Sequence, residues 1–260
     1  MSRFPDERIV VDYVAPRHLA GGGDPTWITV PLHRACGWSL ENEPLTPLTP
    51  DVVLTSPDQK ALLRLEPDPD SQWWTLHHAP EQAAPAWYAS FGARTPVEFI
   101  AAVTDALTDP AADTAAAPDP YDVLRQADWT PAGPRDGLVS PDGTTFLQRA
   151  DEASAWFATV MVNGSRIVWH AHFSEHTPSR LIAAFTASLT DPTPIARVVD
   201  TWRPPTLNPR LVTRTQVGMR AALVAFALED RVHTLSTRHA PPATPPSAPP
   251  GQPPGPGRSR

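Results

Sequence analysis

The chain repeats one sequence unit, and this repeat constrains the architecture more than any other feature. Ser56-Pro57-Asp58 recurs 84 residues later as Ser140-Pro141-Asp142. Further matches follow in the same order at slightly smaller spacings: Trp73-Trp74 with Trp156-Phe157, Trp87 to Phe91 with Trp169 to Phe173, Thr95-Pro96 with Thr177-Pro178, and Thr108-Asp109-Pro110 with Thr190-Asp191-Pro192. Ordered matches of this kind predict two copies of one fold unit. Short loops between strands absorb the changes in spacing.

Hydrophobic periodicity predicts the same elements in each copy: a short helix, four antiparallel strands and a long helix. In the first copy, 52–54 and 61–65 form a hairpin, and 73–77 and 87–91 alternate like strands. Thr95 and Pro96 then begin a helix that carries an apolar stripe and ends near Asp109. The expected fold class is α+β, with the two tandem copies forming a pseudo-twofold body.

The repeated Ser-Pro-Asp triplets have a structural interpretation. Proline presets φ for a turn, and serine and aspartate side chains bond turn backbone. Six residues are therefore expected to build hairpin turns and to perform no catalysis: Ser56, Pro57, Asp58, Ser140, Pro141 and Asp142.

Shifts in composition divide the chain into four parts. Residues 1–112 hold the first repeat with an N-terminal lead-in, and 119–195 hold the second. Residues 196–238 form a connector and a C-terminal helix, whose apolar stripe begins at Val217 and continues to Val232. The proline-rich stretch 239–260 is expected to be a disordered tail.

Composition excludes several classes of function. A formal net charge of −7 disfavours nucleic acid, because phosphate neutralisation needs clustered cations. Cys36 is the only cysteine, which excludes an internal disulfide and any multi-cysteine zinc site. No apolar run approaches the roughly 20 residues that span a bilayer. We expect a cytoplasmic protein without membrane association and without a cofactor.

The paired Ser-Pro-Asp turns, the Trp73-Trp74 strand and the stretch from Phe91 to Asp109 resemble a known family, as does the segment from Ala20 to Trp38. The chain is similar to the actinomycete SPDY-domain family, domain of unknown function 317, which usually occurs in tandem. The resemblance covers residues 14 to 195. It implies no established activity and no catalytic residue, and it points towards mobile-element or plasmid biology.

The binding candidates lie where the two copies differ or carry sheet aromatics. Tyr88 and Ser90 of the first copy become His170 and His172 of the second. Residues two apart in a strand share a face, so each pair should project together. With the aromatic and cationic neighbours, the candidate binding residues are Trp73, Trp74, Tyr88, Ser90, Arg94, Trp156, His170 and His172.

Three histidines of the second copy define a candidate zinc site. His170 and His172 would share a strand face, and His176 follows in the next loop. The first copy has Tyr88, Ser90 and Arg94 there, so such a site would belong to one copy only. A polar solvent-facing strand is the simpler interpretation.

Three functional hypotheses remain. The favoured one is a non-catalytic module that binds an as yet unidentified protein partner. The alternative is single-stranded nucleic-acid binding, with sheet aromatics stacking on bases and arginines holding phosphates. The third is a metal-dependent hydrolase that uses the histidines of the second copy. Since no nucleophile elbow or His-Glu-x-x-His helix occurs, the chain is not expected to be an enzyme.

Overall fold

The computed structural model describes residues 7–41, 52–66, 72–82, 84–111, 118–133, 136–150 and 154–240. The first copy consists of α1 (Thr26–Arg34), β2 (Ser39–Glu41), β3 (Val52–Thr55), β4 (Ala61–Leu65), β5 (Gln72–His78), β6 (Trp87–Gly92) and α2 (Val97–Thr108). The second consists of α3 (Pro120–Gln126), β7 (Thr130–Pro131), β8 (Gly137–Val139), β9 (Thr145–Arg149), β10 (Trp156–Val162), β11 (Arg166–Phe173) and α4 (Ser179–Thr190). The predicted α+β class and tandem copies are confirmed. Each copy has one extra short strand, β2 or β7, too short to show periodicity.

The two copies share one sheet. Its ten antiparallel strands run in the order β2-β3-β4-β5-β6-β11-β10-β9-β8-β7, so β6 and β11 form the junction between the copies. At this junction Ser90 lies opposite His172, with Ala89 opposite Phe173 and Phe91 opposite Ala171. Ser90 and His172 are also equivalent positions of the repeat. The pseudo-twofold axis therefore passes between these two residues.

The sheet register corrects one sequence match. Trp74 lies opposite Leu65 and Phe91, and Trp156 lies opposite Arg149 and Phe173. Trp74 is therefore the equivalent of Trp156, and the match of Trp73-Trp74 with Trp156-Phe157 was wrong by one residue. A register shift in β5 between Gln72 and Trp74 places Trp73 in an irregular position. The connection from β9 to β10 is therefore two residues shorter than the equivalent connection from β4 to β5.

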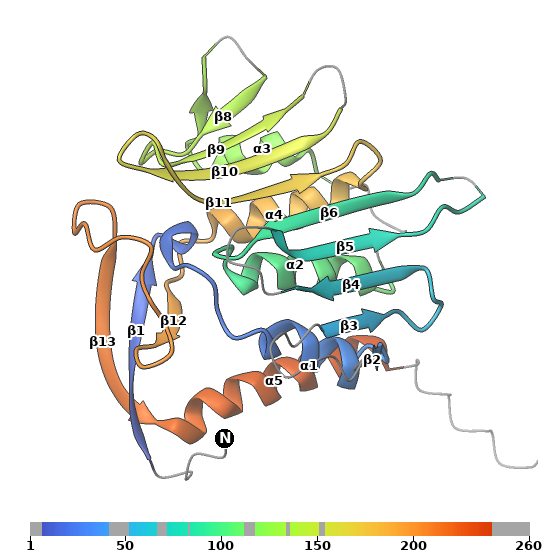
Figure 1. Cartoon of the computed structure of the whole chain (residues 1–260), viewed down its shortest axis with the longest axis horizontal. Helices are drawn as coiled ribbons and strands as arrows, with labels where there is room; N and C mark the ends of the chain where they lie inside the picture. Colours follow the sequence, from blue (N-terminus) through green and yellow to red (C-terminus); the bar gives the residue numbers. More distant parts are fainter. Residues whose placement is uncertain are drawn as a thin grey trace, which may run out of the picture.

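Within the described ranges, the helices cover one face of the ten-stranded sheet and leave the other uncovered (Figure 1). Helices α2 and α4 pack against each other beneath the junction, with α1 beside α2 and α3 beside α4. The core lies between these helices and the sheet. Phe91, Phe173 and Phe185 meet at its centre, with ring centroids 5.2–6.2 Å apart. Each such aromatic pair contributes about 0.5–1.5 kcal/mol beyond simple burial. We call the uncovered face the open face.

A second, three-stranded sheet joins the two ends of the described chain. It runs in the order β12 (Ile195–Val198), β1 (Arg8–Ala15) and β13 (Thr213–Arg220). The short helix η1 (Arg17–Leu19) follows β1, and α5 (Ala221–His239) follows β13. Strand β1 is not predicted by the sequence pattern. The C-terminal helix begins later than predicted, since Val217 belongs to β13 and pairs with Val11.

Two partly buried ion pairs fasten this smaller sheet and α5 to the repeats. Arg197 of β12 makes a bidentate contact with Glu98 of α2 at 2.6 and 2.8 Å. Arg231 of α5 makes a bidentate contact with Asp105 of α2 at 2.7 and 2.9 Å. The predicted disordered tail falls, from residue 241 onward, outside the described residues. Within the described ranges, no helix combines the length and apolarity that crossing a membrane requires.

Candidate functional site

The two Ser-Pro-Asp turns use the same set of hydrogen bonds. In the first, the Ser56 hydroxyl donates to the Asp58 carboxylate at 2.5 Å and accepts from the Ala61 backbone N–H at 2.9 Å. In the second, Ser140 makes the same two bonds with Asp142 and Thr145. Each carboxylate also accepts one backbone N–H two residues later. The triplet therefore closes a hairpin through its own side chains.

Among the described residues, a distant side chain binds the second turn and none binds the first. Nε2 of His18, a residue of η1, lies 2.9 Å from Oδ2 of Asp142 and 2.8 Å from the Thr144 hydroxyl. Because a carboxylate only accepts, Nε2 holds the proton. Burial by itself raises the pKa of Asp142, but the hydrogen bond and charge of His18 and the bond from Ser140 outweigh burial. They hold this pKa well below its ordinary value.

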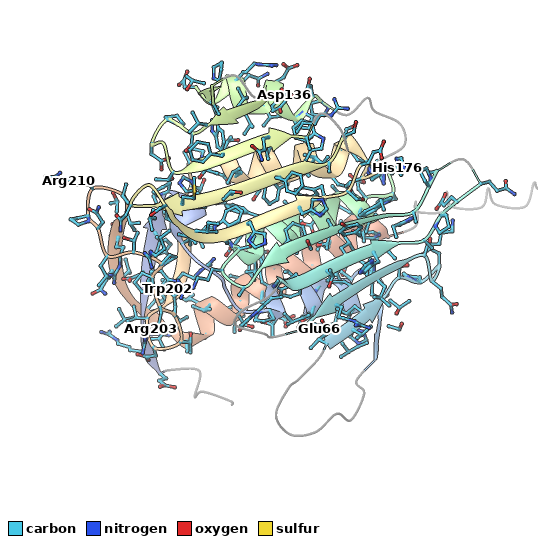
Figure 2. The ribbon with its side chains drawn as sticks, turned by 45° about the horizontal axis from the view of Figure 1, so that its top comes forward. Glu66, Asp136, His176, Trp202, Arg203 and Arg210 are labelled. Atoms are coloured by element: carbon cyan, nitrogen blue, oxygen red, sulfur yellow. The ribbon has the colours of Figure 1, made fainter. Side chains whose placement is uncertain are left out.

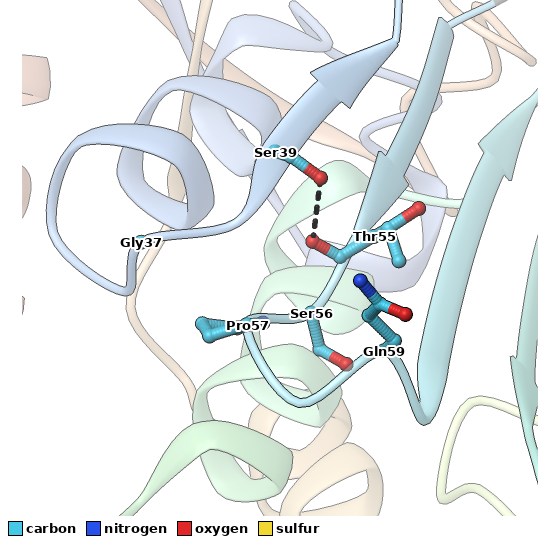
Figure 3. A pocket seen from close by; sticks show the side chains of 6 residues that line it. All are labelled: Gly37, Ser39, Thr55, Ser56, Pro57 and Gln59. Carbon is cyan, nitrogen blue, oxygen red and sulfur yellow. Dashed lines mark hydrogen bonds between the residues drawn. The ribbon is translucent and has the colours of Figure 1, made fainter.

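The shallow pocket beside the first turn contains no group suited to catalysis. Its lining consists of small polar and uncharged residues, namely Gly37, Ser39, Thr55, Ser56, Pro57 and Gln59 (Figure 3). Ser39 already donates to the carbonyl oxygen of Thr55 at 3.4 Å. A pocket lined by these side chains supplies neither a general acid nor a general base.

The open face carries a continuous row of aromatic rings. Four side chains from four neighbouring strands form it, in the order His77 of β5, Tyr88 of β6, His172 of β11 and Phe157 of β10. The centroid distances along the row are 6.0 Å, 5.1 Å and 4.6 Å. The row crosses the pseudo-twofold axis, so each copy contributes two rings. We call these four side chains the aromatic row.

Register explains why these side chains share a face. Directly opposed residues of an antiparallel pair point the same way. Tyr88 lies opposite His77, and His172 lies opposite both Ser90 and Phe157. Figure 2 looks onto this side of the sheet. Burial lowers the pKa of His172, and the neighbouring His170 lowers it further, so the imidazole in the middle of the row is neutral near pH 7.

The structure separates the predicted binding residues into two groups. Tyr88, Ser90, His170 and His172 lie on the open face, where Tyr88 is 40% exposed. Trp74 and Trp156 do not lie on the open face, so the interpretation of these two residues as surface aromatics was wrong. They are 2% and 9% exposed and lie on the helix-covered face, because they pair with the core residues Phe91 and Phe173.

The remaining predicted residues lie at the margins. Trp73 is half-buried beside the register shift of β5, and Arg94 is exposed in the turn after β6. His176 follows the end of β11 and lies apart from the middle of the sheet (Figure 2). Among the residues that the structure describes, no three His, Cys, Asp or Glu side chains come close enough together to hold a metal ion. The structure therefore does not bring His170, His172 and His176 together as a zinc site.

Sequence reasoning missed three residues of these arrangements. His77 and Phe157 complete the aromatic row, and strand alternation with Tyr88 and His172 could have identified both once the register was known. His18 gave no local signal, because its partner Asp142 is 124 residues away.

The one cysteine lies apart from both arrangements. Cys36 is half-buried, with its sulfur 3.8 Å from the Thr108 hydroxyl and 3.5 Å from Nε2 of His239. Burial is the largest influence on its thiol and raises the pKa. A raised pKa leaves little thiolate near pH 7, which does not fit an activated nucleophile.

Comparison with known proteins gives one match. The model of the family SPDY, domain of unknown function (DUF317), matches residues 55–112 and 139–195. These segments run from each Ser-Pro-Asp turn to the end of each long helix, so the resemblance in tandem copies is confirmed. No curated protein and no solved structure matches the chain.

Proposed function

We propose that this chain, which carries two SPDY domains, is a non-catalytic module that binds a protein partner with the open face of its shared sheet. The aromatic row is the observation that supports this most strongly. It runs over both copies and is complete only where β6 pairs with β11. Rows of rigid aromatic side chains are typical of the centres of protein interfaces.

Other residues of the open face extend an apolar surface over the second copy. Ile167, opposite Met161, is 57% exposed, and Phe146 lies opposite Thr159 on the same side of the sheet. Together with Phe157 they give this half of the face an apolar character. A protein partner with its own apolar side chains suits such a surface.

The charges of the open face favour a protein over a single-stranded nucleic acid. Arg64 is paired with Glu66 at 2.7 Å, and the central His172 is neutral near pH 7. Nucleic-acid grooves combine stacking rings with cations that follow the phosphates. Near the aromatic row, the described residues supply rings without a matching line of free cations.

The test places a photo-crosslinking phenylalanine derivative at Tyr88, in the middle of the row. A matched chain carries the derivative at Leu223, which is 55% exposed on α5. Illumination in cells should capture one defined protein through position 88 and not through position 223. Binding of that protein, once purified, should weaken about tenfold with Tyr88→Ala, as expected for a hot-spot residue.

Two results would overturn the proposal. One is equal capture of the protein from both positions. The other is binding of a labelled single strand at low salt that Tyr88→Ala abolishes, since this would identify the aromatic row as a base-stacking surface. The fold should survive the substitution, because Tyr88 is 40% exposed.

A further inference from the structure

Arg17 and His18 of η1, called the lead-in below, occupy a site on the second copy. Side chains and one carbonyl on the helix-covered side, at one end of the sheet, hold residues 17–18 there. Nη1 of Arg17 lies 2.6 Å from Asp191 and also donates to the Ser188 carbonyl at the end of α4. The His18 imidazole contacts Asp142, and its carbonyl accepts the Trp169 indole N–H at 2.8 Å. An Arg-His dipeptide thus binds two carboxylates and one indole.

The first copy has the same three groups at equivalent positions. Asp58 corresponds to Asp142 in the repeated turn, Trp87 corresponds to Trp169, and Asp109 corresponds to Asp191. The local geometry agrees. Each helix-terminal aspartate has an extended backbone, with φ of −65° and −61°, and accepts an N–H two residues later at 2.9 and 2.8 Å.

Within the described residues, nothing takes the place of residues 17–18 on the first copy. Asp58 and Asp109 are exposed, and no cation there pairs with Asp109. Trp87 is only 6% exposed, yet its indole N–H donates to no atom of the described chain. The lead-in lies at one end of the sheet, and the first turn lies at the opposite end (Figure 1).

We propose that Asp58, Trp87 and Asp109 form a second site, open to a partner segment that carries an arginine followed by a histidine. The chemistry follows from the occupied copy. A guanidinium pairs with the carboxylate at the end of α2, where the helix dipole also favours a cation. An imidazole binds the turn carboxylate, and the carbonyl of the same residue accepts the indole N–H.

The two sites differ in ways that weaken the first. Thr144, whose hydroxyl accepts from His18, is replaced by Lys60, which is bound to Glu81 at 2.9 Å. Val160, opposite Trp169, is replaced by His78, whose ring stacks on Trp87 at 5.2 Å. Binding from a separate chain also has to overcome the loss of translational freedom that a covalent lead-in avoids. A dissociation constant of about 1 mM for a short peptide is the expected scale.

The test uses a labelled peptide, Val-Ala-Pro-Arg-His-Leu-Ala-Gly, which copies residues 14–21. Binding to the full chain is measured by fluorescence anisotropy and by the shift of the Trp87 indole N–H signal in NMR, assigned with Trp87→Phe. Asp58→Asn and Asp109→Asn should each weaken binding about tenfold, as expected when one charged hydrogen bond is lost. Asp142→Asn, the matched change in the second copy, should leave binding unchanged. A peptide in which alanine replaces the histidine should bind the wild-type chain about as weakly as the unaltered peptide binds the Asp58→Asn variant.

Each other outcome refutes the proposal. Absence of binding at about 10 mM peptide would show that the first site is not a receptor for this chemistry. Binding that survives both Asp58→Asn and Asp109→Asn would show contact elsewhere, and loss of binding only in Asp142→Asn would mean that the peptide displaces the lead-in. Both substituted carboxylates of the first copy are exposed, so these variants should fold. The site lies on the helix side of the sheet, so its failure leaves the proposal for the open face intact.

Discussion

The two turn aspartates should differ in their contribution to stability, although the repeat makes them equivalent. In Asp142→Asn, one amide oxygen can still accept from Ser140, but the new NH2 group faces the Nε2–H of His18. The variant therefore loses a charge-assisted hydrogen bond and gains a donor facing a donor. Such a loss costs about 1.5–3 kcal/mol, and the 32% exposure of the Asp142 side chain places it near the lower end, at about 2 kcal/mol.

The matched change Asp58→Asn should cost about 0.5 kcal/mol. Asp58 is exposed, and its bonds to Ser56 and Lys60 reach a single oxygen that an amide retains. Urea denaturation followed by tryptophan fluorescence measures both free energies of unfolding. Equal costs for the two variants would refute the role assigned to His18. His18→Ala combined with Asp142→Asn should cost less than the sum of the single changes, since both remove the same contact.

Acid should reduce this difference. The pKa of Asp142 is lowered in the folded state, so its contribution is complete above the unfolded value of about 3.9 and is lost as pH falls below it. The gap between wild type and Asp142→Asn should therefore shrink as pH falls from about 5 to about 3. A gap that widened on acidification would contradict the assigned direction of the shift.

Three further outcomes are expected. Trp169→Phe should destabilise the chain by about 1 kcal/mol more than Trp87→Phe, because only Trp169 bonds a buried carbonyl; equal urea midpoints would contradict this. Cys36 should react with an aromatic disulfide reagent at pH 8 more slowly than glutathione does, and unfolding in urea should remove the difference, because burial raises the pKa of its thiol. Arg197→Ala should cost about 3 kcal/mol in the same denaturation assay, because it leaves the partly buried Glu98 carboxylate unpaired; a cost below about 1 kcal/mol would show that water replaces the guanidinium.

The repeat made the architecture predictable, but the sequence did not determine which residues lie opposite each other on neighbouring strands. Strand alternation placed Tyr88 and His172 correctly on one face, because a period of two is a local property. It could not place Trp74 and Trp156, since each has an adjacent aromatic residue that points to the opposite face, and only the pairing with Phe91 and Phe173 decides which of the two is buried. The interpretation of residues 217–220 as helix failed for a similar reason. Val217 fits an apolar helical stripe, yet its pairing with Val11 in the smaller sheet holds it in a strand.

Long-range contacts limited the prediction of the candidate sites. The aromatic row requires β6 to pair with β11, and no local pattern in either strand announces that pairing. His18 reaches Asp142 across 124 residues, and its neighbour Arg17 reaches Asp191 across 174. Such contacts depend on where β1 lies, and β1 itself was missed because its partners, β12 and β13, come from the other end of the chain.

The junction of β6 with β11 has a consequence for how such a chain can originate. Equivalent residues face each other there, as they do across the axis of a symmetric homodimer, so a single-copy ancestor could have built the same sheet by association of two chains. In a homodimer the two residues on the axis must be identical. Fusion into one chain removes that restriction, and serine at 90 beside histidine at 172 is a combination that only the fused form can hold. The asymmetry of the open face is in this sense a product of covalent linkage.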